Sequence, residues 1–291
     1  MTIQIPVTVL GGYLGSGKTT MVNHLLRTAN GVRLAVLVNE FGELPIDEDL
    51  IEAEDDDIIS IAGGCVCCSF GSDLSGALME MAQLEPPPDH LLIESSGVAI
   101  PSAIVGSVSL LDGFRTDGIV IVADAETVEE NARSKYMSDT VLRQLSDANI
   151  IVLNKTDLVT TTALEFTLAW LKAQNPDVSV IKAQQGAVPM AAVLDRFAAP
   201  HATNAPHHHT ANMDMTVLKP ENPVDVEKLA RELASDARGL VRAKGFATDL
   251  SGQKMLIQVV GNRWDISKAA DDMADGLVCL GYKAETSEDT A

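Results

Sequence analysis

Residues 12–19 read Gly12-Tyr13-Leu14-Gly15-Ser16-Gly17-Lys18-Thr19, between an apolar run at residues 3–10 and a helical pattern at residues 18–29. In such a loop the glycines let successive backbone N–H groups point inward at an anion, and the helix amino terminus adds its partial positive charge. A glycine-rich turn without a ligand is the alternative. The strand before the loop and the helix after it favour a phosphate-binding loop, or P-loop, for a nucleoside triphosphate.

Specific roles follow for the side chains of this loop. Lys18 is expected to reach the β- and γ-phosphates, and Thr19 to place its hydroxyl on Mg²⁺. The residues of this segment that we expect to contact the nucleotide are Gly12, Gly15, Ser16, Gly17, Lys18, Thr19 and Thr20.

The pattern around the loop predicts an α/β fold. Short, β-branched runs predict buried parallel strands at residues 3–10, 33–38, 90–94, 118–123 and 149–153. Helical patterns occupy residues 18–29, 73–84, 138–146 and 162–173. This alternation predicts a doubly wound, mostly parallel sheet, whose ligands bind at the carboxyl ends of the strands.

The alternation ends near residue 197. We expect a nucleotide-binding domain at residues 1–197, a linker with proline and histidine at residues 198–212, and a smaller α+β domain at residues 213–284. Residues 285–291 form a polar tail. In the smaller domain we expect strands at residues 213–219, 240–247 and 254–260, and helices at residues 224–234 and 266–277.

The composition narrows the classes of partner. Among 291 residues, 41 are acidic and 21 are basic, for a formal net charge of −20. Such a surface repels phosphate backbones and anionic lipid, so we expect no nucleic acid and no membrane as partner. It suits metal cations or basic proteins, and it is also an ordinary soluble surface. No apolar run is long enough to span a membrane, and the first ten residues lack a signal peptide's basic region, so we expect a cytoplasmic protein.

Asn154-Lys155-Thr156-Asp157 follows the apolar residues 150–153. The Asp157 carboxylate can accept hydrogen bonds from the N1–H and 2-amino groups of guanine, whereas adenine offers neither donor. Asn154 can bond the other edge of the purine, and the stem of Lys155 can lie over the ring. The segment resembles the guanine-binding signature of GTPases, so we expect GTP, although a polar turn is the alternative.

Glu94-Ser95-Ser96-Gly97 follows the predicted strand at residues 90–94. At this place ordinary GTPases carry Asp-x-x-Gly, whose carboxylate holds Mg²⁺ through water and whose glycine meets the γ-phosphate. Val98 stands where Ras-like enzymes keep a water-orienting glutamine, so we expect slow hydrolysis. Glu40 and Glu43, in a predicted switch loop, are candidates for positioning water or metal, with an ordinary solvated loop as the alternative.

Three cysteines, Cys65, Cys67 and Cys68, lie within four residues after Gly63-Gly64. Thiolates suit Zn²⁺ and also Cu(I), and a nearby helix amino terminus lowers their pKa. Water, Glu40, Glu43 or a partner residue could supply a fourth ligand. Buried thiols or a redox pair are the alternatives. Cys279 stands alone in an apolar stretch and is expected in the core, while His207-His208-His209 could bind metal weakly or be a solvated tract.

The order of these motifs resembles the CobW family of GTP-binding metallochaperones. The motifs on which this resemblance rests are the P-loop, Asn39-Glu40-Phe41-Gly42, Gly63-Gly64-Cys65-Val66-Cys67-Cys68, Glu94-Ser95-Ser96-Gly97 and Asn154-Lys155-Thr156-Asp157. Residues 241–246 and 258–264 look like the family's carboxyl-terminal domain.

The resemblance implies a SIMIBI-class GTPase domain and a zinc or cobalt ion on the Cys-x-Cys-Cys motif. It also implies that the metal passes to a client metalloprotein with GTP turnover. A homodimer is plausible for this class. The competing hypotheses are a metal-responsive sensor or buffer that uses GTP only as a ligand, and a P-loop kinase acting on a small molecule.

Overall fold

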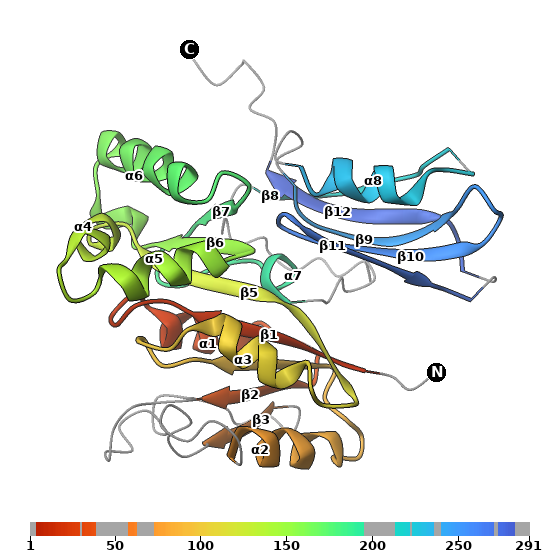
Figure 1. Ribbon diagram of the computed structural model, residues 1–291, viewed down its shortest axis with the longest axis horizontal. Coiled ribbons are helices and arrows are strands. Elements are labelled where there is room, and N and C mark those ends of the chain that lie inside the picture. Colours follow the sequence, from red (N-terminus) through yellow and green to blue (C-terminus); the bar gives the residue numbers. More distant parts are fainter. Residues whose placement is uncertain are drawn as a thin grey trace. The chain divides into compact units, whose positions relative to one another are not determined.

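The computed structural model describes residues 4–29, 31–38, 58–62, 73–194, 213–221, 223–235, 240–270 and 273–282. The chain divides into two compact units, drawn in Figure 1. One comprises Met1–Pro176 and Val180–Arg196, and the other comprises Asp177–Ser179 and Phe197–Ala291. Each unit has its own sheet and its own core.

The first unit is built on a seven-stranded sheet with the order β3-β2-β4-β1-β5-β6-β7. Its strands are β1 (Ile5–Gly11), β2 (Leu34–Val38), β3 (Ile58–Ala62), β4 (His90–Glu94), β5 (Phe114–Asp124), β6 (Ile150–Asn154) and β7 (Ser179–Lys182). Strand β1 pairs in parallel with β4 on one side and β5 on the other. Every residue of β1, β4 and β6 is buried, as expected for strands covered on both faces.

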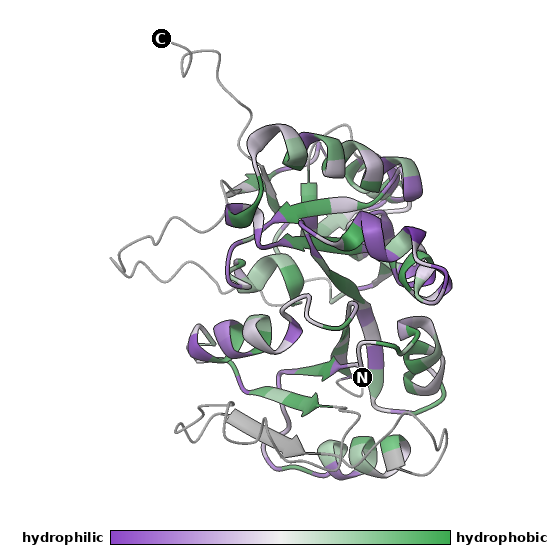
Figure 2. Ribbon diagram, turned by 90° about the vertical axis from the view of Figure 1, so that its left-hand side faces the viewer, coloured by the Kyte–Doolittle hydropathy of each residue, from purple (hydrophilic) through white to green (hydrophobic). Residues whose placement is uncertain are grey.

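Helices cover both faces of this sheet, and Figure 2 shows its strands as mostly apolar ribbons between them. The helices of the unit are α1 (Lys18–Arg27), α2 (Asp73–Ala82), α3 (Pro101–Val108), α4 (Val128–Arg133), α5 (Ser138–Asp147), α6 (Thr161–Gln174) and α7 (Met190–Val193). Helices α2 and α3 bury Leu78, Met81 and Ile104 against β1, β2 and β4. Among the described helices, none is both long and apolar enough to cross a membrane.

The predicted doubly wound fold is therefore confirmed. All five strands and all four helices predicted for this unit are present, with ends that differ by a few residues. The sequence did not predict the strands β3 and β7, which have five and four residues, or the short helices α3, α4 and α7. These elements are too short for a hydrophobic period to stand out.

In the residues that the structure describes, the second unit has a five-stranded sheet with the order β11-β10-β9-β12-β8 and the helix α8. Its elements are β8 (Met213–Leu218), α8 (Val226–Leu233), β9 (Leu240–Thr248), β10 (Lys254–Val260), β11 (Arg263–Lys268) and β12 (Gly276–Tyr282). Each strand of this sheet pairs with its neighbours in antiparallel orientation. Leu229 and Leu233 of α8 share a core with Ala243, Ile257 and Cys279, which confirms the expected core position of Cys279.

The predicted helix at residues 266–277 is wrong, because this stretch contains the end of β11 and the start of β12. Ile266 lies opposite Ile257 of β10, and Leu277 lies opposite Gly245 of β9. In β11 the residues alternate between exposed and partly buried, so Trp264 and Ile266 face the core at a period of two. Pairing of β11 with β10 and of β12 with β9 outweighs the local helical pattern of this stretch.

Candidate functional site

The P-loop adopts a left-handed backbone conformation, which strongly favours glycine, at three positions. Gly12, Gly15 and Gly17 have φ values of 138°, 75° and 99°. A Cβ on Gly12 would lie 2.2 Å from the carbonyl oxygen of Val122, and one on Gly17 would lie 2.3 Å from Nδ2 of Asn154. The N-cap residue of α1 is Gly17, which has no side chain to cap the first turn. Its amino terminus is therefore suited to binding an anion through backbone N–H groups.

A pocket lies between the P-loop and the segment that follows β4. Its lining residues are Leu14, Gly15, Gly17, Lys18, Thr19, Thr20, Glu94, Ser95, Ser96 and Gly97. The two segments meet because β1 and β4 are neighbours, with Leu10 opposite Glu94, and parallel strands end at the same edge of the sheet. The structure thus brings together the predicted phosphate-binding residues and the predicted Glu94–Gly97 motif.

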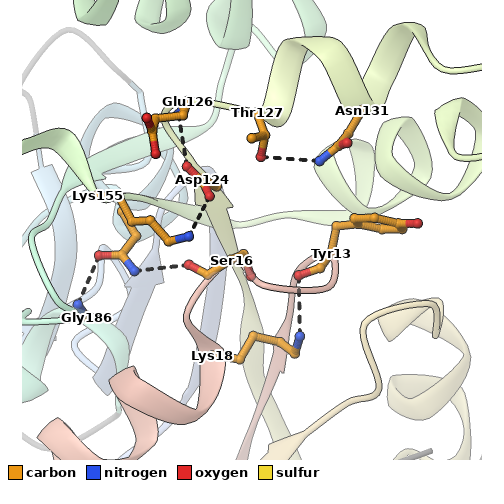
Figure 3. A network of polar contacts seen from close by, with 10 residues as sticks. Tyr13, Ser16, Lys18, Asp124, Glu126, Thr127, Asn131, Lys155 and Gly186 are labelled. Carbon is orange, nitrogen blue, oxygen red and sulfur yellow. Dashed lines mark hydrogen bonds and ion pairs between the residues drawn. The ribbon is translucent and has the colours of Figure 1, made fainter. Parts of the chain in front are cut away.

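Oxygen ligands suited to Mg²⁺ lie together in this pocket. The Thr19 hydroxyl donates a hydrogen bond of 3.0 Å to Oε1 of Glu94, and Glu94 is 2% exposed. A hydroxyl beside a buried carboxylate fits a hard divalent cation. Lys18 is 9% exposed, and its Nζ lies 3.5 Å from the carbonyl oxygen of Tyr13, folded back over the loop (Figure 3). All three side chains line or enclose the place that phosphates would occupy.

Gly97 packs directly on the P-loop. A Cβ at this position would lie 2.8 Å from the backbone nitrogen of Leu14 and 2.6 Å from its Cδ2. Any larger residue would therefore push the two segments apart. Glycine is required here for a close approach between backbones rather than for an unusual φ.

Asn154 links the P-loop to the loop after β7, a role that the sequence did not predict. Its Nδ2 donates to the carbonyl oxygen of Ser16 at 3.0 Å, and its Oδ1 accepts from the backbone N–H of Gly186 at 2.9 Å. The side chain is 2% exposed. Asn154 therefore holds two backbone segments together at the carboxyl end of β6.

Lys155 and Asp157 lie at the surface next to this link. Lys155 has a left-handed φ of 59°, and its Nζ forms an ion pair of 2.7 Å with Oδ2 of Asp124 (Figure 3). Asp124 also accepts a hydrogen bond from the backbone N–H of Glu126. Asp157 is exposed in the short 3₁₀ turn Thr156–Leu158. Its carboxylate is thus accessible to a ligand, while Lys155 is held by a neighbour.

Three residues near this link, Asp124, Gly186 and His24, were not among the predicted site residues. Asp124 could have been predicted as a site residue, because it directly follows the predicted strand at residues 118–123. Gly186 has a φ of 68°, and a Cβ there would lie 2.7 Å from the backbone of Met21. His24 lies within 3.1 Å of the Val188 carbonyl oxygen through Nε2, and burial lowers the pKa of this imidazole. No signal in the sequence indicated the last two, because each depends on α1 meeting a loop more than 160 residues away.

Several predicted residues lie outside the described part of the chain: Glu40, Glu43, Cys65, Cys67, Cys68, His207, His208 and His209. Within the described ranges, no group of three or more histidine, cysteine, aspartate or glutamate residues could hold a metal ion. The proposed cysteine site therefore stays a prediction from the sequence.

The fold and the pocket define a P-loop nucleotide-binding protein. Residues 6–182 match the CobW/HypB/UreG nucleotide-binding domain, and residues 213–289 match the cobalamin synthesis protein cobW C-terminal domain. The chain belongs to the CobW/HypB/UreG family.

Two relatives extend this similarity beyond the first domain. The chain is 31% identical to a zinc chaperone CobW from Sinorhizobium sp, over 90% of this chain and 87% of that protein. It is 28% identical to zinc-regulated GTPase metalloprotein activator 1 from Dictyostelium discoideum, over 84% of this chain and 63% of that protein. A crystal structure of the Zn(II)-bound YjiA GTPase from E. coli has the same fold, with 22% identity, a TM-score of 0.50, and coverage of 97% of this chain and 95% of that one.

Proposed function

We propose that this protein is a GTPase that binds zinc and delivers it to a client metalloprotein. The observation that carries the nucleotide half of the proposal is the contact between Thr19 and Glu94 within the P-loop pocket. The sequence of the cysteine motif and the names of the relatives support the metal half.

The phosphates of GTP are held by the P-loop in this proposal. Backbone N–H groups of residues 12–20 surround the β-phosphate, and Lys18 leaves the Tyr13 carbonyl to reach the β- and γ-phosphates. That contact is 3.5 Å long, which is longer than a good hydrogen bond. Mg²⁺ held by Thr19, with Glu94 behind it, would neutralise charge that develops on the phosphate oxygens.

Guanine is recognised at the other end of the loop. The exposed Asp157 accepts the two donors on the Watson–Crick edge of the base, and the stem of Lys155 lies over the ring. Asp124 fixes the far end of Lys155 at 2.7 Å and so limits where the stem can lie. Asn154 bonds to the P-loop at Ser16 and to the loop after β7 at Gly186, and this fixes the position of the base site relative to the phosphate site.

Hydrolysis is slow without a partner in this proposal. Val98, beside Gly97, is apolar and 46% exposed, so it cannot orient the attacking water. Glu40 and Glu43 are the candidates for that role. Gly97 approaches the γ-phosphate, because it lines the same pocket as Lys18 and Thr19.

Zinc is the cargo of the protein and is held by Cys65, Cys67 and Cys68. Three thiolates suit Zn²⁺, and a site short of one protein ligand can pass its ion to a client. Cobalt is the alternative cargo, because the same ligands accept Co²⁺. Free thiols of this kind require a reducing compartment such as the cytoplasm. The functional unit is a monomer or a homodimer that meets its client in the GTP-bound state.

The deciding experiment measures zinc affinity in the presence of GDP and of a non-hydrolysable GTP analogue. A chaperone driven by GTP requires different affinities in the two states, because coupling between two sites is a difference in binding free energy. Identical affinities would leave a zinc buffer that merely also binds GTP. A preference for ATP over GTP in the same assay would instead support a small-molecule kinase.

A further inference from the structure

Gln144 is a buried amide on α5 that bonds twice to the loop after β4. Its Nε2 donates to the carbonyl oxygen of Ala99 at 2.8 Å and to that of Gly97 at 3.2 Å. The residue is 1% exposed. An amide nitrogen carries two hydrogens, and both are used here. Because a buried carbonyl without a partner is unfavourable, the pair of bonds holds this loop in one arrangement.

The same loop is held at two further points. The backbone N–H of Ser95 donates to the carbonyl oxygen of Leu10 at 2.8 Å, which continues the pairing of β4 with β1. Gly97 is pressed against Leu14 of the P-loop, where no Cβ would fit. The loop after β4 is thus held by three contacts: Ser95 bonds to β1, Gly97 packs on the P-loop, and Gln144 bonds to Gly97 and Ala99.

Gln144 is not among the residues that line the phosphate pocket. Gly97 and Leu14 line that pocket, whereas Gln144 lines a separate small cavity together with Tyr13, Leu14 and Asp124. Gly97 is therefore in direct reach of a nucleotide in that pocket, and Gln144 is not part of its lining. Any influence of Gln144 on the nucleotide has to pass through the Gly97 segment.

We infer that Gln144 is a positioning residue that sets Gly97 for contact with the γ-phosphate. This inference rests on the proposed GTPase function. GDP lacks the phosphate that Gly97 would meet, so it gains little from an ordered Gly97 segment. A triphosphate binds better to the arrangement that Gln144 stabilises, and by linkage it stabilises that arrangement in return. Since α5 packs against α3, α4 and α6, the γ-phosphate can in this way influence a surface outside the pocket.

The test replaces Gln144 by methionine, which has a similar size and no donor. Affinities for GDP and for a non-hydrolysable GTP analogue are measured with fluorescent nucleotides, and hydrolysis is measured in single turnover. We expect GDP affinity to stay within about twofold, while affinity for the analogue and the hydrolysis rate each fall about tenfold, as for loss of one or two buried hydrogen bonds.

Val141→Ala is the matched control. Val141 lies one turn earlier on α5, is 3% exposed and lines the same small cavity as Gln144. Its truncation lowers the melting temperature through lost packing. It should leave the ratio of the two affinities as in the wild type, so a selective loss in Gln144→Met reflects the two hydrogen bonds and not general destabilisation.

Gln144→Ala serves as a second variant if Gln144→Met does not fold. The smaller side chain admits water, which can satisfy the carbonyls of Gly97 and Ala99 without fixing their positions. The same selective loss is expected. An unchanged ratio of analogue to GDP affinity in the folded variant would overturn the inference while leaving the GTPase proposal intact. If the wild type neither prefers guanine nucleotides nor hydrolyses GTP, the proposed function fails, and the inference fails with it.

Discussion

Thr19 and Glu94 are 75 residues apart in the sequence, yet the hydroxyl of one donates a 3.0 Å hydrogen bond to the carboxylate of the other. The contact joins the first turn of α1 to the end of β4, and it exists because β4 lies beside β1 in the sheet. It is the point at which two separate motifs become one site. Its removal is therefore a direct test of the proposed Mg²⁺ site.

Glu94→Gln keeps the size of the side chain and removes its charge. Since Glu94 would support Mg²⁺ through Thr19 or a water, we expect apparent Mg²⁺ affinity in GTP hydrolysis to fall about 10- to 100-fold. Binding of GDP without Mg²⁺ should change little. The measurement is a Mg²⁺ titration of single-turnover hydrolysis. A titration curve identical to that of the wild type would place the metal elsewhere.

Asp157→Asn tests recognition of the base. An amide can no longer accept both donors of guanine, but it can donate to the 2-oxo group of xanthine. We expect GTP affinity to fall at least about 100-fold and XTP affinity to rise, because a site built on paired hydrogen bonds rejects a mismatched partner strongly. Competition between the two nucleotides measures the change. Unaltered preference for GTP would show that Asp157 does not face the base.

Gly17→Ala and Gly15→Ala form a matched pair in the P-loop. Both glycines have positive φ, so alanine costs about 1–2 kcal/mol of backbone strain at either position. Only at Gly17 would the new Cβ also meet Nδ2 of Asn154, at 2.3 Å, whereas at Gly15 no atom of the described residues beyond its chain neighbours lies within 4 Å. We expect the larger loss of stability and of nucleotide binding for Gly17→Ala. Urea unfolding curves compare them, and equal losses would mean that the Asn154 contact is unimportant.

His24 predicts a specific dependence of stability on pH. Burial, opposed by the hydrogen bond to Val188 and assisted by Arg27, lowers the pKa of His24 below its ordinary value of 6.5. The unfolded chain therefore takes up the proton first as pH falls below 6.5, and the folded state loses stability until its own lower pKa is passed. Well above pH 6.5, where the imidazole is neutral in both states, this contribution is constant.

The check on His24 is a His24→Gln variant, whose amide can still donate to the Val188 carbonyl. Urea midpoints of the two proteins are compared at pH 7.5 and pH 5.5. The wild type should lose more stability than the variant between these values. A difference between the proteins that does not vary with pH would contradict the lowered pKa.

Cys67→Ser tests the proposed zinc site, with Cys279→Ala as its control. We expect zinc binding to weaken more than about tenfold, since a total of roughly 10–16 kcal/mol in a structural zinc site is shared among its ligands. Cys279 is 3% exposed in the core formed with α8, so its replacement should cost stability and leave zinc affinity unchanged. Elemental analysis and competition with a chelator measure both. Full zinc binding by Cys67→Ser would remove this residue from the site.

The sequence predicted most of the first unit because its signals are local. Each buried strand is a short β-branched run, and each long helix has its own period, so these elements could be read without knowing their neighbours. The second unit was harder. Residues 266–277 have helical composition, but β10 and β9 offer pairing partners that only the folded sheet supplies.

The P-loop, the guanine-type motif and the cysteine cluster were determined by the sequence itself, since each is a contiguous segment whose chemistry depends on residue type and spacing. The tertiary structure decided which of these segments meet. In the folded chain, Thr19 bonds to Glu94, and Asn154 bonds to both Ser16 and Gly186. Gln144 bonds to the carbonyl oxygen of Gly97. These contacts depend on the order of strands in the sheet and on helices packing over it, and burial across the whole chain determines both.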